Sequence, residues 1–301
     1  MKDRPTVLVI DFNNIFYMSY YGPRLINSKG MNVGPIKTFF FKLRTFIESF
    51  EPRYIVFASD LSREKTFRRK MFPPYKSKRK PVDTTMVEMM RCTSQMIALL
   101  GYPMINNETY EADDIMGMIS KLVVRNEMDC VITSSDRDLY QLVNDHVNIF
   151  NPRNAELITP EYIMMHYKLT PSQWVELKML QGDKSDNIPG VNGIGGTIAQ
   201  VLMEKYHCVN NIYEHLDELK PKMQESLTRD KDKLPLMRQL VTIVTDYSML
   251  DLSMKTIERG EAFMPELYQL ITELELFSLV KLMQYTFTPH PINIEQEVVK
   301  P

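Results

Sequence analysis

The chain has 301 residues, of which 44% are hydrophobic and 25% charged, a mix that is typical of globular proteins with ample core material. No apolar run approaches the about 18 residues that a membrane-spanning helix needs, so a membrane protein is not expected. The net charge of −2 and the three scattered cysteines give no overall signal for nucleic acid, for a thiolate metal site or for a disulfide framework.

In the first half of the chain, short apolar runs alternate with helical patterns. The apolar runs predict buried strands at 6–10, 53–59 and 130–135. The helical patterns lie at about 13–20, 35–50, 84–100 and 110–126. Strands that alternate with helices predict an α/β fold with a mostly parallel, twisted sheet flanked by helices. The first strand is short and ends in an acid, which is not typical of a signal peptide.

After about residue 168 the pattern becomes mostly helical, interrupted by the Gly-rich stretch "GVNGIGG" at 190–196. We therefore predict an α/β core over 1–168 and a helical region over 169–301. The last residues, about 288–301, contain three prolines and little periodicity, which predicts a loose tail.

Each of the three predicted strands is followed directly by an acid, namely Asp11, Asp60 and Asp136. Because ligands of open α/β sheets bind beyond the carboxyl ends of the strands, we expect these acids to meet at one edge. Any one of them alone is more often a solvated surface group, but their shared location favours a site. Further acids stand close together in sequence and are candidates for the same site: Glu111, Asp113, Asp114, Asp138, Asp183 and Asp186.

Crowded carboxylates need cations. Two of them about 4 Å apart repel by roughly 4 kcal/mol at an effective dielectric constant near 20. The five histidines show no ligand spacing, and oxygen-only ligation favours Mg²⁺ or Mn²⁺ over zinc. Two such ions in a carboxylate cluster commonly catalyse phosphoryl displacement, so the sequence predicts a phosphodiester substrate.

Two further stretches suit phosphate binding. Glycines 190, 193, 195 and 196 permit close backbone approach before a helix start, although a plain inter-helix turn is the alternative. Between Leu61 and Lys80 there are nine basic residues and one acid, interleaved with aromatic side chains. Such a segment tracks a nucleic-acid backbone and stacks on bases, although a solvated loop is the alternative.

The motifs "VIDFNN", "FASD", "FRRKMFPPYKSKRKP", "YEADD", "SSDRDLYQLV" and "GDKSDNIPGVNGIG", in this order, resemble those of phage and bacterial 5′-nucleases. This family comprises flap endonucleases and the 5′–3′ exonuclease domain of polymerase I. The resemblance implies a PIN-like nuclease core with a helical arch at about 61–90. It also implies a helix-three-turn-helix at about 172–206 that grips duplex DNA.

The resemblance implies roles for individual residues. The implied metal ligands are Asp11, Asp60, Glu111, Asp113, Asp114, Asp136, Asp138, Asp183 and Asp186, some of them acting through water. Lys76 and Arg79 would lie beside the scissile phosphate, and Tyr75 near the terminal base. The implied DNA-binding residues are Arg68, Arg69, Gly190, Gly193, Gly195, Gly196 and Thr197, and the glycine hairpin would also hold K⁺. Relatives usually carry lysine where Thr197 stands, so one phosphate contact is expected to be lost.

The resulting expectation is a Mg²⁺-dependent structure-specific 5′-nuclease, a 5′–3′ exonuclease and flap endonuclease that leaves 5′-phosphates, with Mn²⁺ as a substitute ion. Its partners would be DNA with 5′ ends, flaps or branches and RNA primers in hybrids, with no membrane. It is expected to be a free-standing monomer in the cytoplasm of a bacterial or phage-infected cell. The alternatives are a PIN-type ribonuclease and a non-catalytic protein that binds DNA structures.

Overall fold

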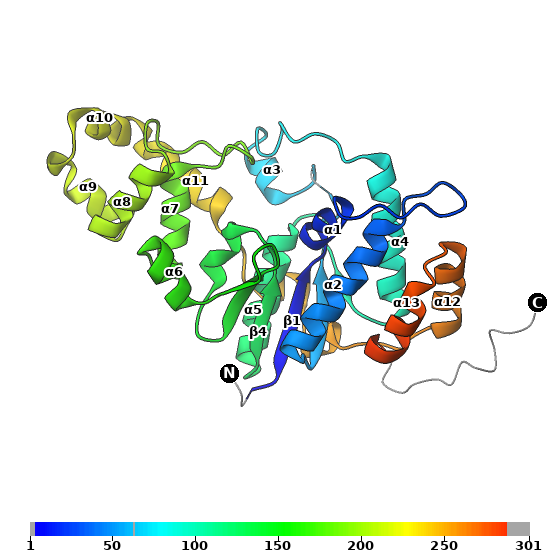
Figure 1. The fold of residues 1–301 in the computed structure, drawn as a ribbon. Coiled ribbons are helices and arrows are strands. Elements are labelled where there is room, and N and C mark those ends of the chain that lie inside the picture. The colour runs from blue at the N-terminus through cyan, green and yellow to red at the C-terminus, as the bar shows by residue number, and fades with distance from the viewer. Residues whose placement is uncertain (1–3, 63, 288–301) are drawn as a thin grey trace, which may run out of the picture.

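The computed structural model describes residues 4–62 and 64–287. At its centre lies a six-stranded sheet (Figure 1). The strand order is β3-β2-β1-β4-β5-β6, and every neighbouring pair is parallel except β5 with β6. The strands are β1 (Thr6–Asp11), β2 (Tyr54–Ala58), β3 (Met104–Ile105), β4 (Asp129–Thr133), β5 (Val147–Asn151) and β6 (Glu156–Ile158). The predicted α/β class with a mostly parallel sheet is thereby confirmed.

The central strand β1 is buried on both faces, which explains its uninterrupted apolar sequence. Val7 and Val9 belong to one hydrophobic core, whereas Leu8 and Ile10 belong to the other. Alternation of successive side chains between the faces of a strand produces this division. Since β1 pairs in parallel register with both β2 and β4, the carboxyl ends of all three strands lie at the same edge.

Helices cover both faces of the sheet. On one face α2 (Gly34–Phe50) packs against β1, with α1 (Phe12–Tyr20) and α4 (Thr84–Leu99) beside it. On the other face α5 (Ala112–Arg125) packs against β1, β2 and β4. These layers are the sheet flanked by helices that the sequence pattern predicted.

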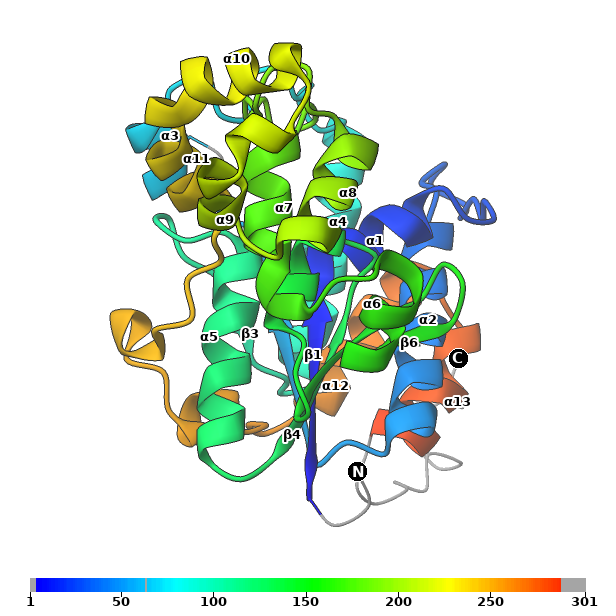
Figure 2. The same ribbon diagram turned by 90° about the vertical axis from the view of Figure 1, so that its left-hand side faces the viewer.

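Most of the helices that follow β6 lie beyond the carboxyl ends of the strands (Figure 2). They include α7 and α8, which flank the Gly-rich stretch. This group consists of α7 (Trp174–Gln181), α8 (Gly196–Tyr206), α9 (Val209–Glu214), α10 (Pro221–Asp230) and α11 (Leu234–Val241), whereas α6 (Pro160–Tyr167) packs against β6.

The last two helices return to the sheet. Helix α12 (Met264–Glu273) packs on α4, and α13 (Ser278–Leu282) packs on α2. Their buried leucines complete the core that β1 and α2 began. The sequence predicted one helical region over 169–301, separate from the α/β core. In the structure α12 and α13 instead pack within that core.

The predicted arch is mostly non-helical. It contains α3 (Phe67–Met71), then turns at 73–78, and α4 begins only at Thr84 with Asp83 as its cap. We call residues 66–80 the basic segment. Two backbone hydrogen bonds tie this segment to the rest of the protein. Phe67 N–H donates to Thr109 O at 3.0 Å, and Lys76 N–H donates to Asp186 O at 2.8 Å.

Three strands were not predicted from the sequence: β3, β5 and β6. The predicted loose tail at 288–301 lies outside the described residues. Within residues 4–62 and 64–287, no helix has the length and apolar character needed to cross a membrane.

Candidate active site

The ends of β1 and β2 fix the first two carboxylates. Asp11 caps α1, and its carboxylate accepts hydrogen bonds from Asn14 N–H at 3.0 Å and from the Ser134 hydroxyl at 2.7 Å. Asp60 follows β2 and accepts from Ala112 N–H at 2.8 Å, at the start of α5. The strand ends and the helix starts therefore hold both side chains in defined positions.

The start of α5 and the end of β4 supply the next carboxylates. Glu111 caps α5, and its backbone N–H donates to the Asp114 carboxylate at 3.1 Å in a capping box. Asp113 lies between them on the first turn of the helix. Asp136 follows β4, where its carboxylate accepts from Asp138 N–H at 2.8 Å. Four separate segments of the chain thus present acids at one edge of the sheet.

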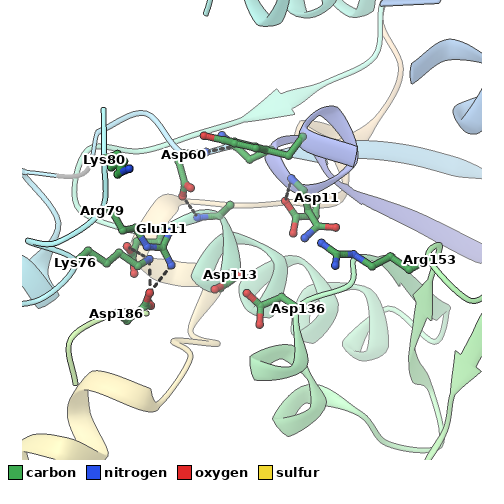
Figure 3. Close-up of a pocket in the computed structure, with 14 residues that line it drawn as sticks. Asp11, Asp60, Lys76, Arg79, Lys80, Glu111, Asp113, Asp136, Arg153 and Asp186 are labelled. Atoms are coloured by element: carbon green, nitrogen blue, oxygen red, sulfur yellow. Dashed lines mark hydrogen bonds and ion pairs between the residues drawn. The ribbon is translucent and has the colours of Figure 1, made fainter. Parts of the chain in front are cut away.

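These acids face a common cavity of about 450 Å³ (Figure 3). Asp11 and Asp136 lie on one side of it, and Glu111 and Asp186 lie on the other. Six of the nine predicted ligands line the cavity: Asp11, Asp60, Glu111, Asp113, Asp136 and Asp186.

The other three predicted ligands do not line the cavity. Asp114 is fully buried and is bound by the Arg68 guanidinium, at 2.6 and 2.7 Å. Asp138 and Asp183 share the buried ammonium group of Lys178 on α7, at 2.6 and 2.7 Å. In this structure an internal cation therefore neutralises each of these three carboxylates.

Two arginines predicted to bind DNA make internal contacts instead. Arg68 is 3% exposed and also donates to Leu240 O at 2.8 Å and to Thr242 O at 2.7 Å. Arg69 donates to the carbonyls of Pro73 and Tyr75 and so holds the turn of its own segment. Both guanidinium groups are thus committed within the protein as it stands here.

The basic segment brings three further side chains to the carboxylates. Lys76 Nζ lies 2.5 Å from Glu111 Oε1 and 3.7 Å from Asp186 Oδ2, and Arg79 pairs with Asp186. The Tyr75 hydroxyl donates to Glu111 Oε2 at 2.7 Å, and its side chain is 3% exposed. Tyr75 was predicted near a terminal base, but here its ring is buried and its hydroxyl orients Glu111.

The backbone at Lys76 is unusual. Its φ of +52° lies in the left-handed region that non-glycine residues rarely adopt. Such backbone geometry tends to occur at functional sites, where the surrounding structure holds it. Here the hydrogen bond from Lys76 N–H to Asp186 O holds this backbone conformation, and the conformation directs the ammonium group toward Glu111.

The electrostatics of the cavity favour a bound cation. Burial raises the pKa of Asp11 to about 7, opposed by the hydrogen bonds from Asn14 and Ser134 and assisted by Asp60 and Asp136. Burial and the charges of Asp136 and Asp11 also raise the pKa of Asp113 well above its usual value. Without a cation these carboxyl groups therefore resist ionisation, and a bound divalent cation would stabilise their charged forms.

The donor set fits a hard divalent ion, because every cavity acid offers oxygen. Among residues 4–62 and 64–287, however, no three acidic, His or Cys side chains are close enough to form a closed ligand set. Two of the six cavity carboxylates, Glu111 and Asp186, are instead paired with Lys76 and Arg79. An ion that binds Glu111 or Asp186 would therefore have to displace Lys76 or Arg79 from that carboxylate.

The Gly-rich stretch forms a tight connection between α7 and α8. A Cβ on Gly190 would overlap the backbone of Gln181 and Gly182, so only glycine fits there. Gly193 has a φ of +79°, and the neighbouring Asn192 N–H donates to Asp230 Oδ2 at 2.9 Å. Three residues at the start of α8 are exposed: Gly195, Gly196 and Thr197.

Several residues of the site were not singled out from the sequence. Lys178 stands among apolar residues of α7, and its neighbours in sequence give no signal that it bridges two acids. Asn14 follows a strand end, a position from which a polar side chain reaches the sheet edge. The cavity-lining residues that sequence reasoning missed are Asn13, Asn14, Tyr17, Lys80, Ala112 and Arg153.

Comparison with known proteins gives two family models that together span most of the chain. Residues 6–168 match the model described as 5′–3′ exonuclease, N-terminal resolvase-like domain. Residues 169–263 match the model described as 5′–3′ exonuclease, C-terminal SAM fold.

A curated relative is the DNA polymerase I of Caldicellulosiruptor bescii, which is 31% identical over 282 residues. The match covers 91% of this chain and 33% of the relative, so the chain spans about a third of the length of that protein.

Solved structures share the fold at low identity. The flap endonuclease of bacteriophage T5, in a complex with DNA and metal ions, has a TM-score of 0.66 at 19% identity, covering 90% of this chain and 99% of that one. The catalytic core of Rad2 with DNA substrate has a TM-score of 0.57 at 17% identity, covering 90% and 87%.

Proposed function

Because this chain belongs to the 5′–3′ exonuclease family, we propose that it is a metal-dependent, structure-specific 5′-nuclease. The proposed substrates are DNA molecules with 5′ ends, flaps or branches, and the proposed products carry 5′-phosphates. The proposal includes RNA primers in hybrids as substrates and a monomeric enzyme. The observation that carries it is the cavity in which six carboxylates face Lys76 and Arg79.

The six cavity carboxylates would hold divalent ions, with Mg²⁺ as the proposed physiological ion, to activate water and to stabilise the leaving oxygen. T5 5′-exonuclease, which shares the fold, has been solved with bound zinc ions. Asp114, Asp138 and Asp183 would support this group from outside the cavity, since each is bound to a buried cation.

Lys76 and Arg79 would bind the non-bridging oxygens of the scissile phosphate. Both are bound to carboxylates here, so each has to exchange a carboxylate for a phosphate oxygen when DNA enters. In a cavity with little water, a positioned cation stabilises the charge that develops at phosphorus more strongly than it would in bulk solvent. Tyr75 and Arg68 both bond Glu111 and would hold it in place during this exchange.

The hairpin between α7 and α8 would bind the duplex. The exposed backbone N–H groups at the start of α8 suit phosphate oxygens, and α8 is long enough to contribute its dipole. K⁺ held by backbone oxygens of the hairpin is part of the proposal. Lys205 would not take the place of the lysine that relatives carry at 197, because it lies in the last turn of α8, at the opposite end from Thr197.

The function is tested with a labelled DNA flap, its RNA counterpart and an RNA–DNA hybrid, each with Mg²⁺ or with a chelator. We expect the DNA flap to be cut only with Mg²⁺ and the new 5′ end to accept ligation, which needs a 5′-phosphate. Exclusive cleavage of the RNA flap would support a PIN-type ribonuclease. Binding without cleavage in every condition would support a non-catalytic protein.

Asp136→Asn is expected to raise the Mg²⁺ concentration for half-maximal turnover by about tenfold or more, because a neutral amide is a poorer ligand for a hard cation. The amide oxygen still accepts the hydrogen bond from Asp138 N–H, so the local backbone is retained. The measurement is a Mg²⁺ titration of flap cleavage. The control is Asp145→Asn, an exposed acid just before β5, at the opposite edge of the sheet from Asp136. An unchanged titration would remove Asp136 from the ligand set.

Gly190→Ala is expected to lower the free energy of unfolding by about 1–3 kcal/mol and to weaken duplex binding, because the new Cβ displaces the hairpin backbone. Thermal unfolding and a binding titration with a duplex measure the two effects. Gly195→Ala is the matched control for stability, since its Cβ meets no atom within 4 Å. Equal unfolding temperatures for the two variants would contradict the close approach at Gly190.

A further inference from the structure

One basic side chain of the active-site cavity, Arg153, comes from the β5–β6 turn and belongs to none of the sequence motifs. Arg153 lines the cavity, and Figure 3 shows its guanidinium directed toward the space near Asp11 and Asp136. It lies on the opposite side from Lys76 and Arg79. The turn that carries it is anchored, because β5 and β6 are paired at Asn151 and Glu156 on either side.

The local backbone places Arg153 at the cavity edge. The Arg153 N–H donates to Asn151 Oδ1 at 3.1 Å, and Ala155 adopts a φ of +56° that closes the turn. Ser134 N–H donates to Phe150 O at 3.1 Å, which joins the base of this hairpin to the segment beside Asp136. The position of Arg153 is therefore coupled to the end of β4, from which Asp136 comes.

The partners of the cavity cations differ. Lys76 and Arg79 are bound to Glu111 and Asp186. The Arg153 guanidinium makes no hydrogen bond or ion pair with any residue in the described ranges. Nearby, the Asp11 carboxylate accepts from Asn14 and Ser134. The guanidinium is thus available to a ligand in a way that Lys76 and Arg79 are not.

The chemistry of such a ligand follows from the group. A guanidinium presents planar N–H donors that match the oxygens of a phosphate in a bidentate arrangement. A nucleic-acid strand that places one phosphate at Lys76 and Arg79 continues with another phosphate on either side. Arg153, across the cavity, is the cation that such a continuing strand would meet.

We propose that Arg153 binds the phosphate next to the scissile one and so sets which phosphodiester is cut. This inference rests on the proposed nuclease function and adds a residue that fixes the register of the strand. A solvated arginine on an ordinary surface turn would have no such position-dependent effect.

The test compares wild type, Arg153→Gln and Arg153→Lys on one flap DNA, with Arg125→Gln as the control. Arg125 is an exposed arginine at the opposite end of α5 from the cavity. Cleavage rates, cut positions and binding without divalent ions are measured for the normal flap. The same measurements are made on flaps with a single neutral methylphosphonate at each phosphate that flanks the cut.

Arg153→Gln is expected to lower kcat/KM about tenfold and to add cuts one nucleotide away, because a charge-assisted bidentate contact is lost. Arg153→Lys is expected to recover part of the rate but not the single cut position. A methylphosphonate at the contacted position should lower kcat/KM of the wild type about tenfold. It should cause no further loss of kcat/KM in Arg153→Gln. Arg125→Gln should match wild type throughout.

The outcomes separate this inference from the proposed function. If wild type cuts the flap and Arg153→Gln matches it in rate and position, the inference is wrong and the function stands. The inference is also wrong if Arg153→Gln lowers kcat/KM relative to wild type by the same factor at every methylphosphonate position. If wild type binds the flap with a position-specific Arg153 contact but never cuts it, the contact stands and the nuclease function is wrong. If wild type neither binds nor cuts, both are wrong.

Discussion

Lys76→Ala is expected to lower turnover on a DNA flap by about 10²–10³-fold, while the affinity for that DNA stays within a few-fold of wild type. The ammonium group lies 2.5 Å from Glu111 and at the edge of the cavity, where it would neutralise charge that develops on the phosphate. Groups that act in the transition state affect turnover more than ground-state binding. The measurement is single-turnover cleavage beside a binding titration without divalent ions.

Folding should tolerate the loss of Lys76. Glu111 keeps the Tyr75 hydroxyl at 2.7 Å and the Arg68 guanidinium at 3.2 Å as partners. The matched control is Lys78→Ala, which removes an exposed lysine two positions away on the same segment. A rate near wild type is expected for this control. A Lys76→Ala rate within threefold of wild type would show that the ammonium group has no part in the reaction.

The same variant should also change metal binding in the absence of DNA. Lys76 would compete with a divalent ion for Glu111 and Asp186, since it is paired with both. Its removal is therefore expected to tighten Mn²⁺ binding to the free protein even as it slows the reaction. Calorimetry with Mn²⁺ and no DNA measures this opposite effect, which a general loss of structure would not produce.

Arg68→Met is expected to lower the free energy of unfolding by about 3–5 kcal/mol, because it leaves the buried Asp114 carboxylate without its cation. Arg68 is 3% exposed and Asp114 is fully buried, so water cannot replace the pair. The guanidinium also binds the carbonyls of Leu240 and Thr242, which connects the basic segment to the end of α11 and the residue after it. Urea unfolding followed by circular dichroism measures the change.

The neighbouring position provides the control for this prediction. Arg69→Met removes a half-buried guanidinium that binds only carbonyls of its own segment, so a loss of about 1 kcal/mol is expected. The double variant Arg68→Met with Asp114→Leu should regain much of the stability, because no unpaired charge remains. A loss below about 1 kcal/mol for Arg68→Met alone would contradict the structural role of the pair.

The sequence predicted the parts of the fold that depend on local pattern. β1, β2 and β4 appear as apolar runs, and each leads to the acid that the parallel sheet brings to its carboxyl edge. β3 has only two residues, which is too short for any periodic signal. The return of α12 and α13 to the first core depends on long-range packing, and an amphipathic pattern does not say which partner a helix will find.

For the candidate site, too, the sequence predicted what depends on chain topology but not what depends on long-range packing. Acids at strand ends could be placed because chain topology alone brings them together. Whether an acid faces a cavity or a buried cation depends on residues far away in sequence. Asp114 is neutralised by Arg68 and Asp183 by Lys178, and neither cation differs in sequence context from a surface one. Arg153 was missed for the same reason, since the hairpin that carries it was not predicted.

The central claim is that the cavity acids bind divalent cations that act on a nucleic-acid strand. The most direct measurement is the crystal structure of the protein with a flap DNA and Mn²⁺, examined by anomalous scattering. The account predicts Mn²⁺ among Asp11, Asp113 and Asp136, with Lys76 and Arg79 moved from Glu111 and Asp186 onto a phosphate. A cavity without Mn²⁺, with both cations still bound to their carboxylates and DNA present elsewhere, would contradict it.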